Sequence, residues 1–309
     1  MLLILANKLR KDGHWVLNNA KFNVTAQQKK EIITVGFFGL LVGFCVSANL
    51  HLDKIFVGSL LSISELGVYS TAFIYGSLIV VPSRAINKIS SIYISEAWKD
   101  NDLVTIQRLY RKTSLNLFII GMFLFMMLWL NIDFVFYYLP EHFRLGKWSI
   151  FFIALSGLFE MGGGALSSVL YSSPDYKYQA LANILYLVLI FLFSYLFIPI
   201  WGITGAGVAV FISMFIYQAL RMLFVYKRYK MQPLEKKHLY VILFSLFIFV
   251  LLYLIPDTEY VIVSVVINSI VISISYLFGF VNLFRFNDLY ELIQKYVPLS
   301  IFELKKSIK

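Results

Sequence analysis

The feature that most constrains this chain is a series of long apolar runs, each of a length suited to crossing a bilayer. A membrane-spanning helix needs about 20 predominantly apolar residues. Hydrophobic residues make up 60% of the chain and gather in such runs between polar connections. The pattern predicts an all-α, polytopic transmembrane helix bundle of about eight spans: Ile32–Leu52, Gly67–Ser83, Ser114–Ile132, Trp148–Leu170, Tyr178–Ile198, Ile203–Tyr226, Leu239–Ile255 and Tyr260–Leu283.

The distribution of Lys and Arg predicts the orientation of these spans. Of the 27 basic residues, Lys54, Arg144 and Lys147 fall in the connections on one side, Arg221 lies inside a span, and the rest fall on the other side. Basic connections stay in the cytoplasm. We therefore expect both termini to be cytoplasmic, and we attribute the net charge of +10 to topology and anionic lipid rather than to nucleic acid.

Residues 47–70 form a short polar hairpin between the first two apolar runs. The hairpin carries Asn49, Asp53 and Lys54 close to the end of the first span. Charge at the mouth of an apolar bundle is costly, which favours a functional role in a cavity. The alternative is that Asp53 and Lys54 only end a helix at the membrane surface.

Glu160 is an ionisable residue near the middle of the span Trp148–Leu170. It lies just before three consecutive glycines, Gly162 to Gly164, which favour a bend or a close helix contact. A carboxylate at this depth is expected to face a bundle interior or a watery cavity. It could take part in proton or ion coupling, contact a ligand inside a cavity, or make a structural hydrogen bond between helices.

Three cations lie at or inside the ends of apolar runs. Arg84 and Lys88 are one helical turn apart, and Arg221 lies about one turn from the end of its span. If these helix ends converge, the cations suit a phosphate-bearing ligand, which Arg binds in a bidentate manner. The alternative is that all three extend toward lipid headgroups.

Catalytic and metal-binding patterns are not found in the sequence. The single cysteine, Cys45, lies in an apolar run, and the histidines at 14, 51, 142 and 238 are too scattered for metal-ligand spacing. The connections on the outer side are short, so they leave no room for an enzymatic domain there. We therefore expect neither an enzyme nor a cofactor.

Several short motifs resemble those of a known family, the polysaccharide flippases of the multidrug/oligosaccharidyl-lipid/polysaccharide exporter superfamily. One set is similar to the seventh and eighth helices of that family: Asp53–Gly58, Leu66–Ser70, Pro82 and Gln107–Tyr110. A second set is similar to the eleventh and twelfth helices and the loop after them: Tyr178, Asn183, Ile198–Pro199, Gly202–Ile203, Gly205–Ala206 and Met231–Pro233. The order and spacing of the motifs together carry the resemblance.

The resemblance implies a domain plan. Family members have two lobes of six helices around a cavity that opens alternately to either side, and many add two helices at the end. On that template residues 32–226 form a MATE-like second lobe, 227–283 a cytoplasmic loop and an extra hairpin, and 284–309 an amphipathic tail. Residues 1–31 form a cytoplasmic lead-in whose start, Met1–Ala6, looks like the end of a missing sixth helix.

The resemblance also implies a function. It suggests a flippase of the bacterial inner membrane that moves undecaprenyl-diphosphate-linked oligosaccharide for O-antigen, lipopolysaccharide or capsule synthesis. Its partners would be that lipid, membrane lipids, and a first-lobe chain or the rest of a longer transporter. Arg84, Lys88, Lys54 and Arg221 would line the substrate path, and Glu160, Asp53 and Asn49 the cavity or coupling site. The alternatives are a cation-coupled multidrug exporter of the same fold or a non-transporting fragment.

Overall fold

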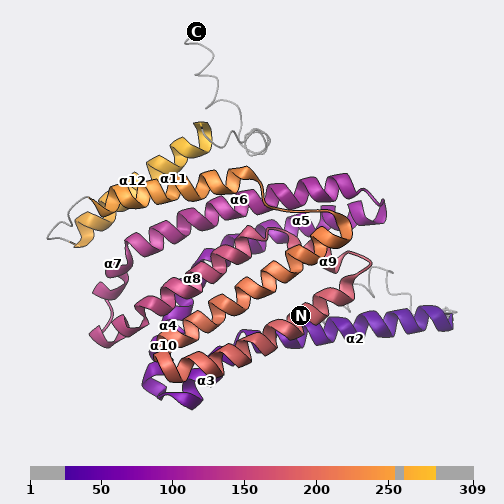
Figure 1. Ribbon diagram of the computed structural model, residues 1–309, viewed down its shortest axis with the longest axis horizontal. Coiled ribbons are helices and arrows are strands. Elements are labelled where there is room, and N and C mark those ends of the chain that lie inside the picture. The colour runs from indigo at the N-terminus through magenta and orange to yellow at the C-terminus, as the bar shows by residue number, and fades with distance from the viewer. Residues whose placement is uncertain (1–24, 255–260, 283–309) are drawn as a thin grey trace, which may run out of the picture. The chain divides into compact units, whose positions relative to one another are not determined.

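The computed structural model describes residues 25–254 and 261–282 (Figure 1). The chain divides into two units, 1–43 and 44–309, and all the contacts discussed below lie within the second unit. The predicted stub at Met1–Ala6 and the predicted amphipathic tail at 284–309 lie outside the described residues.

The described residues form helices joined by short connections and contain no strand, which confirms the predicted all-α bundle. The elements in chain order are α2 (Ala26–Asn49), α3 (Leu52–Leu60), α4 (Ile63–Ser77), η1 (Leu78–Val80), α5 (Val81–Lys99), α6 (Leu103–Leu130), α7 (Ile132–Tyr137), η2 (Glu141–Gly146), α8 (Lys147–Gly162), α9 (Leu166–Tyr171), α10 (Tyr176–Tyr229), α11 (Lys236–Tyr253) and α12 (Val261–Asn282).

Six helices in the described part of the chain are long and apolar enough to cross a membrane. The chain is therefore a multi-pass membrane protein. The count is lower than the eight predicted spans for two reasons. Two of the predicted spans lie in the single 54-residue helix α10, and the span predicted over Trp148–Leu170 is divided between α8 and α9.

Helix α10 is a hairpin of two antiparallel limbs, which Figure 1 shows folding back on itself near α3. The turn is at Gly202, whose φ of 55° is one that side-chain-bearing residues rarely adopt. Near the other end, the ring of Tyr178 on the first limb stacks on Phe224 of the second, with centroids 3.6 Å apart. The connection between the predicted spans Tyr178–Ile198 and Ile203–Tyr226 is thus the tip of this hairpin.

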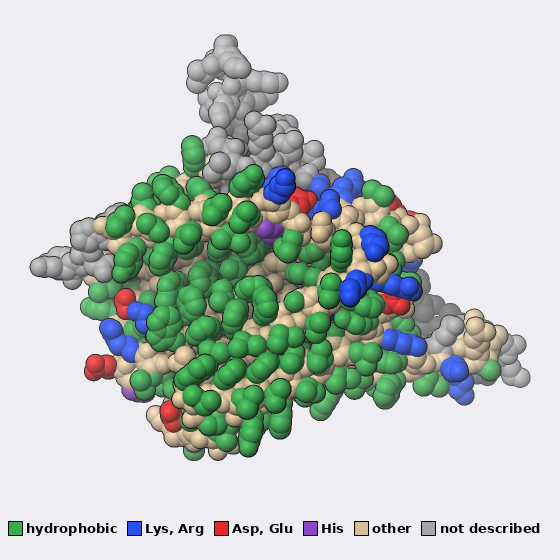
Figure 2. All heavy atoms as spheres, in the orientation of Figure 1, with side chains coloured by type: hydrophobic (Ala, Val, Ile, Leu, Met, Phe, Trp, Pro, Cys, Tyr) green, Lys and Arg blue, Asp and Glu red, His purple; other side chains and the backbone are tan. Residues whose placement is uncertain are grey.

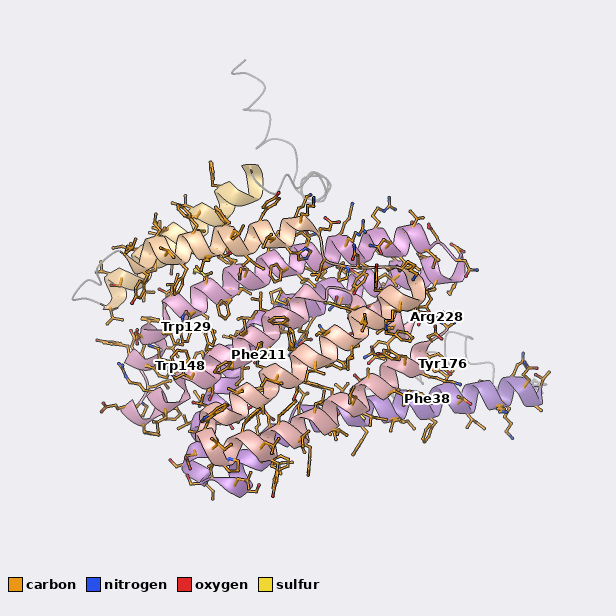
Figure 3. All side chains as sticks on the ribbon, viewed as in Figure 1. Phe38, Trp129, Trp148, Tyr176, Phe211 and Arg228 are labelled. Carbon is orange, nitrogen blue, oxygen red and sulfur yellow. The ribbon has the colours of Figure 1, made fainter. Side chains whose placement is uncertain are left out.

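A carboxylate joins the two ends of α10. Asp175 Oδ2, just before the first limb, accepts hydrogen bonds from Arg228 Nε at 2.8 Å and from the Tyr229 hydroxyl at 2.7 Å. The hydrogen bond from Tyr229, followed by that from Arg228, holds the pKa of Asp175 below its usual value. The hairpin is therefore closed at the end opposite Gly202 as well. Figure 3 shows Tyr176 and Arg228 at this same end.

The break between α8 and α9 follows the glycine run. Gly164 has a φ of 55°, and a Cβ there would collide with the backbone nitrogen of Ser114 on α6. The Ser114 hydroxyl donates to the Gly162 carbonyl at 2.5 Å, so its oxygen accepts from His238 Nε2, 3.1 Å away on α11. The Thr113 hydroxyl accepts from the Ala165 amide at 3.1 Å. Helix α6 therefore provides hydrogen-bond partners for backbone groups at the interruption between α8 and α9.

Helix α8 is the centre of the second unit, where it packs against α4, α6 and the second limb of α10. The pair α11 and α12 packs on α6 through a separate apolar cluster that includes Ile119, Ile248 and Ile272. Figure 2 shows a broad hydrophobic surface across the middle of the molecule, with Lys and Arg gathered mainly at one end and fewer charged groups at the other. This distribution is typical of a protein embedded in lipid.

Candidate functional site

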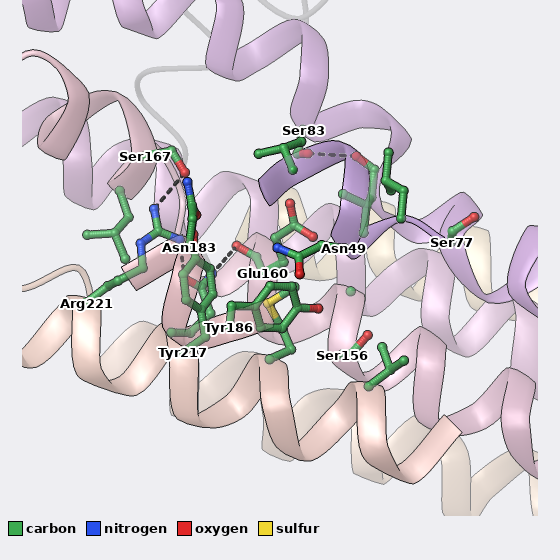
Figure 4. Close-up of a pocket in the computed structure, with 18 of the residues that line it drawn as sticks. Asn49, Ser77, Ser83, Ser156, Glu160, Ser167, Asn183, Tyr186, Tyr217 and Arg221 are labelled. Atoms are coloured by element: carbon green, nitrogen blue, oxygen red, sulfur yellow. Dashed lines mark hydrogen bonds between the residues drawn. The ribbon is translucent and has the colours of Figure 1, made fainter. Parts of the chain in front are cut away.

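A polar cavity of about 410 Å³ opens between the helices of the second unit. Its lining comes from the end of α2, from α3, α4 and α5, from α8 and α9, and from both limbs of α10. Figure 4 shows polar side chains from these elements pointing into the same space, including Asn49, Glu160, Asn183 and Arg221. Segments from distant parts of the sequence therefore meet at one site.

Arg221, on the second limb of α10, is the buried cation of this cavity, with only 3% of its surface exposed. Its Nη1 donates to Gln218 Oε1 at 3.0 Å and its Nη2 donates to the Ser167 hydroxyl at 2.7 Å. The guanidinium also lies 4.5 Å from the centroid of the Tyr217 ring. All of these partners are neutral, and Nε is buried without a hydrogen-bond partner among the described residues.

Glu160 lies in the same cavity near the end of α8. Its backbone carbonyl accepts from Gln218 Nε2 at 3.2 Å, but no hydrogen bond or ion pair reaches its carboxylate from any residue that the structure describes. Arg221 and Arg84 are close enough for their charges to act on it. The carboxylate is thus left available to the cavity.

Asp53 is fully buried at the start of α3 and also lines the cavity. Its Oδ2 accepts from the Tyr69 hydroxyl of α4 at 2.5 Å, and its Oδ1 has no partner among the described residues. A helix-ending residue at the membrane surface would be exposed to water. The structure instead places Asp53 inside helix α3, against a tyrosine of the neighbouring helix.

The two limbs of α10 share a polar network on the cavity wall. The Tyr217 hydroxyl donates to Asn183 Oδ1 at 2.6 Å, and Gln179 Nε2 donates to the Tyr217 oxygen at 2.9 Å. Asn183 Nδ2 in turn donates to the Tyr171 hydroxyl of α9 at 3.3 Å. These bonds hold the limbs in one register next to Arg221.

The remaining predicted cations lie in different places. Arg84 and Lys88 are both exposed, but only Arg84 lines the cavity, from α5. Lys54 also lies outside the lining. Its Nζ is 4.1 Å from the centroid of the Phe73 ring and donates to the Leu50 carbonyl at 3.4 Å. The structure therefore brings together Asn49, Asp53, Arg84, Glu160 and Arg221, but not Lys54 or Lys88.

Several lining residues were not singled out as site residues by sequence reasoning. They are uncharged polar residues of the same lining: Ser167, Gln179, Tyr186, Tyr217 and Gln218. Polar residues at positions 179 and 183, and again at 217, 218 and 221, repeat at helical spacing within apolar runs. That spacing could have predicted a row of polar side chains along one face of each limb of α10.

The described residues contain no group of histidine, cysteine or acidic side chains that could hold a metal ion. Neither the family models nor the curated proteins compared with this chain match it. The geometry described above and the short motifs in the sequence are therefore the basis for assigning a function.

Proposed function

We propose that this chain is the second-lobe part of a membrane flippase for lipid-linked oligosaccharide. The substrate would be a polyprenyl lipid that carries its saccharide on a diphosphate, used in surface polysaccharide synthesis. Three observations support the proposal: the multi-pass bundle, the polar cavity within it, and the sequence motifs that resemble polysaccharide flippases.

The observation that carries the proposal is the environment of Arg221. A buried guanidinium is costly to desolvate and normally has a carboxylate partner. Among the described residues Arg221 has only hydroxyl, amide and aromatic partners, and its Nε has none. The Glu160 carboxylate acts on Arg221 without contacting it. An anion that enters the cavity would supply a counter-charge in direct contact, and a diphosphate matches the fork of guanidinium donors.

The proposal also covers the membrane in which the chain lies and the polypeptide that would complete the cavity. The predicted cytoplasmic position of the basic connections favours a bacterial inner membrane protein with both termini inside. A cavity between two lobes needs a second wall, so we propose that a first-lobe polypeptide completes the transporter. Transport rather than catalysis is the activity that we assign to this cavity.

A cation-coupled multidrug exporter is the second candidate. The observation that favours it is the pair of carboxylates, Asp53 and Glu160, in the cavity lining. An organic cation would bind near these groups, whereas a diphosphate would bind at Arg221. The two candidates therefore predict ligands of opposite charge.

Binding to the purified chain in neutral detergent tests the proposal. The probes are a short-chain polyprenyl diphosphate, the matching uncharged polyprenol and a lipophilic cation, each titrated while thermal unfolding is followed. We expect the diphosphate to stabilise the chain more than the polyprenol, and Arg221→Gln to remove the difference. Arg108→Gln, which changes an exposed arginine on α6, is the matched control and should retain it.

A diphosphate that stabilises the chain no more than the polyprenol would overturn the proposal. Stabilisation by the lipophilic cation alone, lost in Glu160→Gln, would instead establish the exporter.

A further inference from the structure

We propose that His238 is a positioning residue, which sets the orientation of the Arg221 guanidinium without contacting the ligand. The inference rests on the proposed function and deepens it, because it extends the binding site to a helix outside the cavity. His238 is buried near the start of α11, and among the described residues none from α11 or α12 lines the cavity. Its effect on Arg221 passes through the interruption between α8 and α9.

The two ring nitrogens of His238 bind different parts of the chain. Nδ1 accepts from the Glu235 amide at 3.0 Å, within a capping box at the start of α11. Nε2 lies 3.1 Å from the Ser114 hydroxyl oxygen on α6. The one proton of that hydroxyl goes to the Gly162 carbonyl, so Nε2 carries a hydrogen and donates it to Ser114. The neutral imidazole thus joins the start of α11 to α6.

The hydrogen bond from His238 accounts for the direction in which Ser114 donates. A hydroxyl inside a helix commonly donates to a carbonyl three or four residues earlier in the same helix. The neighbouring Thr113 does so, since it donates to the Leu109 carbonyl at 2.9 Å. Ser114 instead donates to Gly162, the last residue of α8. Because His238 occupies a lone pair of the Ser114 oxygen and fixes the hydroxyl, we expect this bond between helices to depend on His238.

Both hydrogen-bond partners of the Arg221 guanidinium are tied to the interruption between α8 and α9. Ser167, which accepts from Nη2, follows the interruption in the first turn of α9. Gln218, which accepts from Nη1, donates to the carbonyls of Phe159 and Glu160 before the interruption, at 3.4 and 3.2 Å. A shift of the interruption would therefore move one partner relative to the other and change the orientation of the guanidinium.

The backbone of the interruption is tightly packed on two sides. A Cβ on Gly163 would collide with the Gln218 amide, and a Cβ on Gly164 would collide with the Ser114 backbone. The glycines are therefore enclosed between α6 and the second limb of α10. Contacts this close transmit a displacement from one side to the other.

Two substitutions separate the roles of the two ring nitrogens. Asparagine places its amide near the position of Nδ1, so it can serve the capping box but is too short to reach Ser114. Glutamine places its amide near the position of Nε2 and can donate to Ser114. In neutral detergent we expect His238→Asn to weaken binding of a short-chain polyprenyl diphosphate by about fivefold or more, whereas His238→Gln should stay within about twofold of the unaltered chain.

Two further variants show whether the effect passes through Arg221 rather than through a general loss of stability. In an Arg221→Gln background, His238→Asn should change the affinity by less than about twofold, because the group that it positions is already absent. Ser245→Ala removes a buried hydroxyl that joins α11 to Tyr276 of α12 at 2.5 Å. It should lower the unfolding temperature and leave the affinity unchanged.

The outcomes separate the inference from the proposed function. A loss of affinity in His238→Asn that His238→Gln avoids, and that is absent in the Arg221→Gln background, supports the inference. Unchanged affinity in His238→Asn, or an equal loss in Ser245→Ala, overturns the inference and leaves the flippase proposal standing. Ser114→Ala interrupts the same contacts from α6 and takes the place of His238→Asn if that variant does not fold. If the unaltered chain binds the diphosphate no better than the polyprenol, the proposed function and the inference are both overturned.

Discussion

The guanidinium of Arg221 lies over the ring of Tyr217, with its Cζ 4.5 Å from the ring centroid. The two residues are one helical turn apart on α10, and Tyr217 is itself fixed by its hydrogen bond to Asn183 on the other limb. The position of the charge is thus determined by both limbs of the hairpin. A flat guanidinium benefits from such stacking more than an ammonium group does.

Arg221→Lys is expected to weaken binding of a polyprenyl diphosphate by about tenfold, although the positive charge is retained. Lysine keeps a point charge but loses the fork of donors and the stacking on Tyr217. Titration of the purified variant measures the affinity, with Arg108→Lys on the exposed side of α6 as the control. Unchanged affinity in Arg221→Lys would show that charge alone is needed.

Asp175→Asn is expected to lower the free energy of unfolding by about 0.5–1 kcal/mol at pH 7, a value suited to a partly exposed ion pair. The pKa of Asp175 is lowered in the folded chain by Tyr229 and Arg228, so its stabilising effect is present above the ordinary carboxyl pKa of about 4. The effect is lost as the pH falls through the lowered pKa.

Thermal unfolding at several pH values measures this difference. The wild-type chain and Asp175→Asn should converge in stability at acidic pH. Glu96→Gln, an exposed carboxylate change on α5, serves as the reference for general effects of charge. A difference that stayed constant down to low pH would contradict the assignment.

Gly202→Ala is expected to destabilise the chain by about 1–3 kcal/mol, because its φ of 55° is strained for any residue with a Cβ. Gly205→Ala should be more damaging, since its Cβ would collide with the Phe197 carbonyl of the opposite limb. Gly67→Ala is the control, because a Cβ there meets nothing within 4 Å. Equal unfolding temperatures for all three variants would argue against the hairpin turn.

Ser114→Ala is expected to cost about 1–3 kcal/mol, because the buried Gly162 carbonyl and His238 ring would each lose a partner. Ser91→Ala removes a hydroxyl that donates only to the Lys88 carbonyl of its own helix, so it should have little effect. Unfolding of the two variants in the same detergent gives the comparison. If Ser114→Ala lost less unfolding free energy than Ser91→Ala, α6 would not stabilise the interruption between α8 and α9.

The orientation can be measured with single added cysteines, because Cys45 is only 4% exposed and should stay unlabelled. A membrane-impermeant maleimide added to intact cells is expected to label Glu141→Cys. It should label Lys237→Cys only after the cells are broken. Labelling of Lys237→Cys in intact cells would reverse the proposed topology.

Much of the fold could be predicted because bilayer thickness fixes the length of a span. The hairpin of α10 was visible as an apolar run interrupted by Pro199 and Gly202. The run of glycines after Glu160 predicted a bend or a close helix contact, and the structure has both, but the sequence could not show which helix supports the break between α8 and α9. That break depends on Thr113 and Ser114, which come from another helix.

The candidate site was predictable in its charges but not in their surroundings. Asp53, Glu160 and Arg221 stand out as ionisable groups in apolar runs, and each of them lines the cavity. Which way a side chain faces depends on helix rotation, so Lys88 could not be told apart from Arg84. The pairing of Asp53 with Tyr69 joins two helices and leaves no pattern in the sequence.

Gln218 links the side chain of Arg221 to the backbone of Glu160. Its side-chain oxygen accepts from Arg221 and its nitrogen donates to the Glu160 carbonyl, so the second limb of α10 is fastened to the end of α8. A rocking motion that opened this bundle would carry both helix segments as one rigid piece. In the proposed transporter, the cation and the carboxylate would then keep their spacing while the helices on the other side of the cavity move.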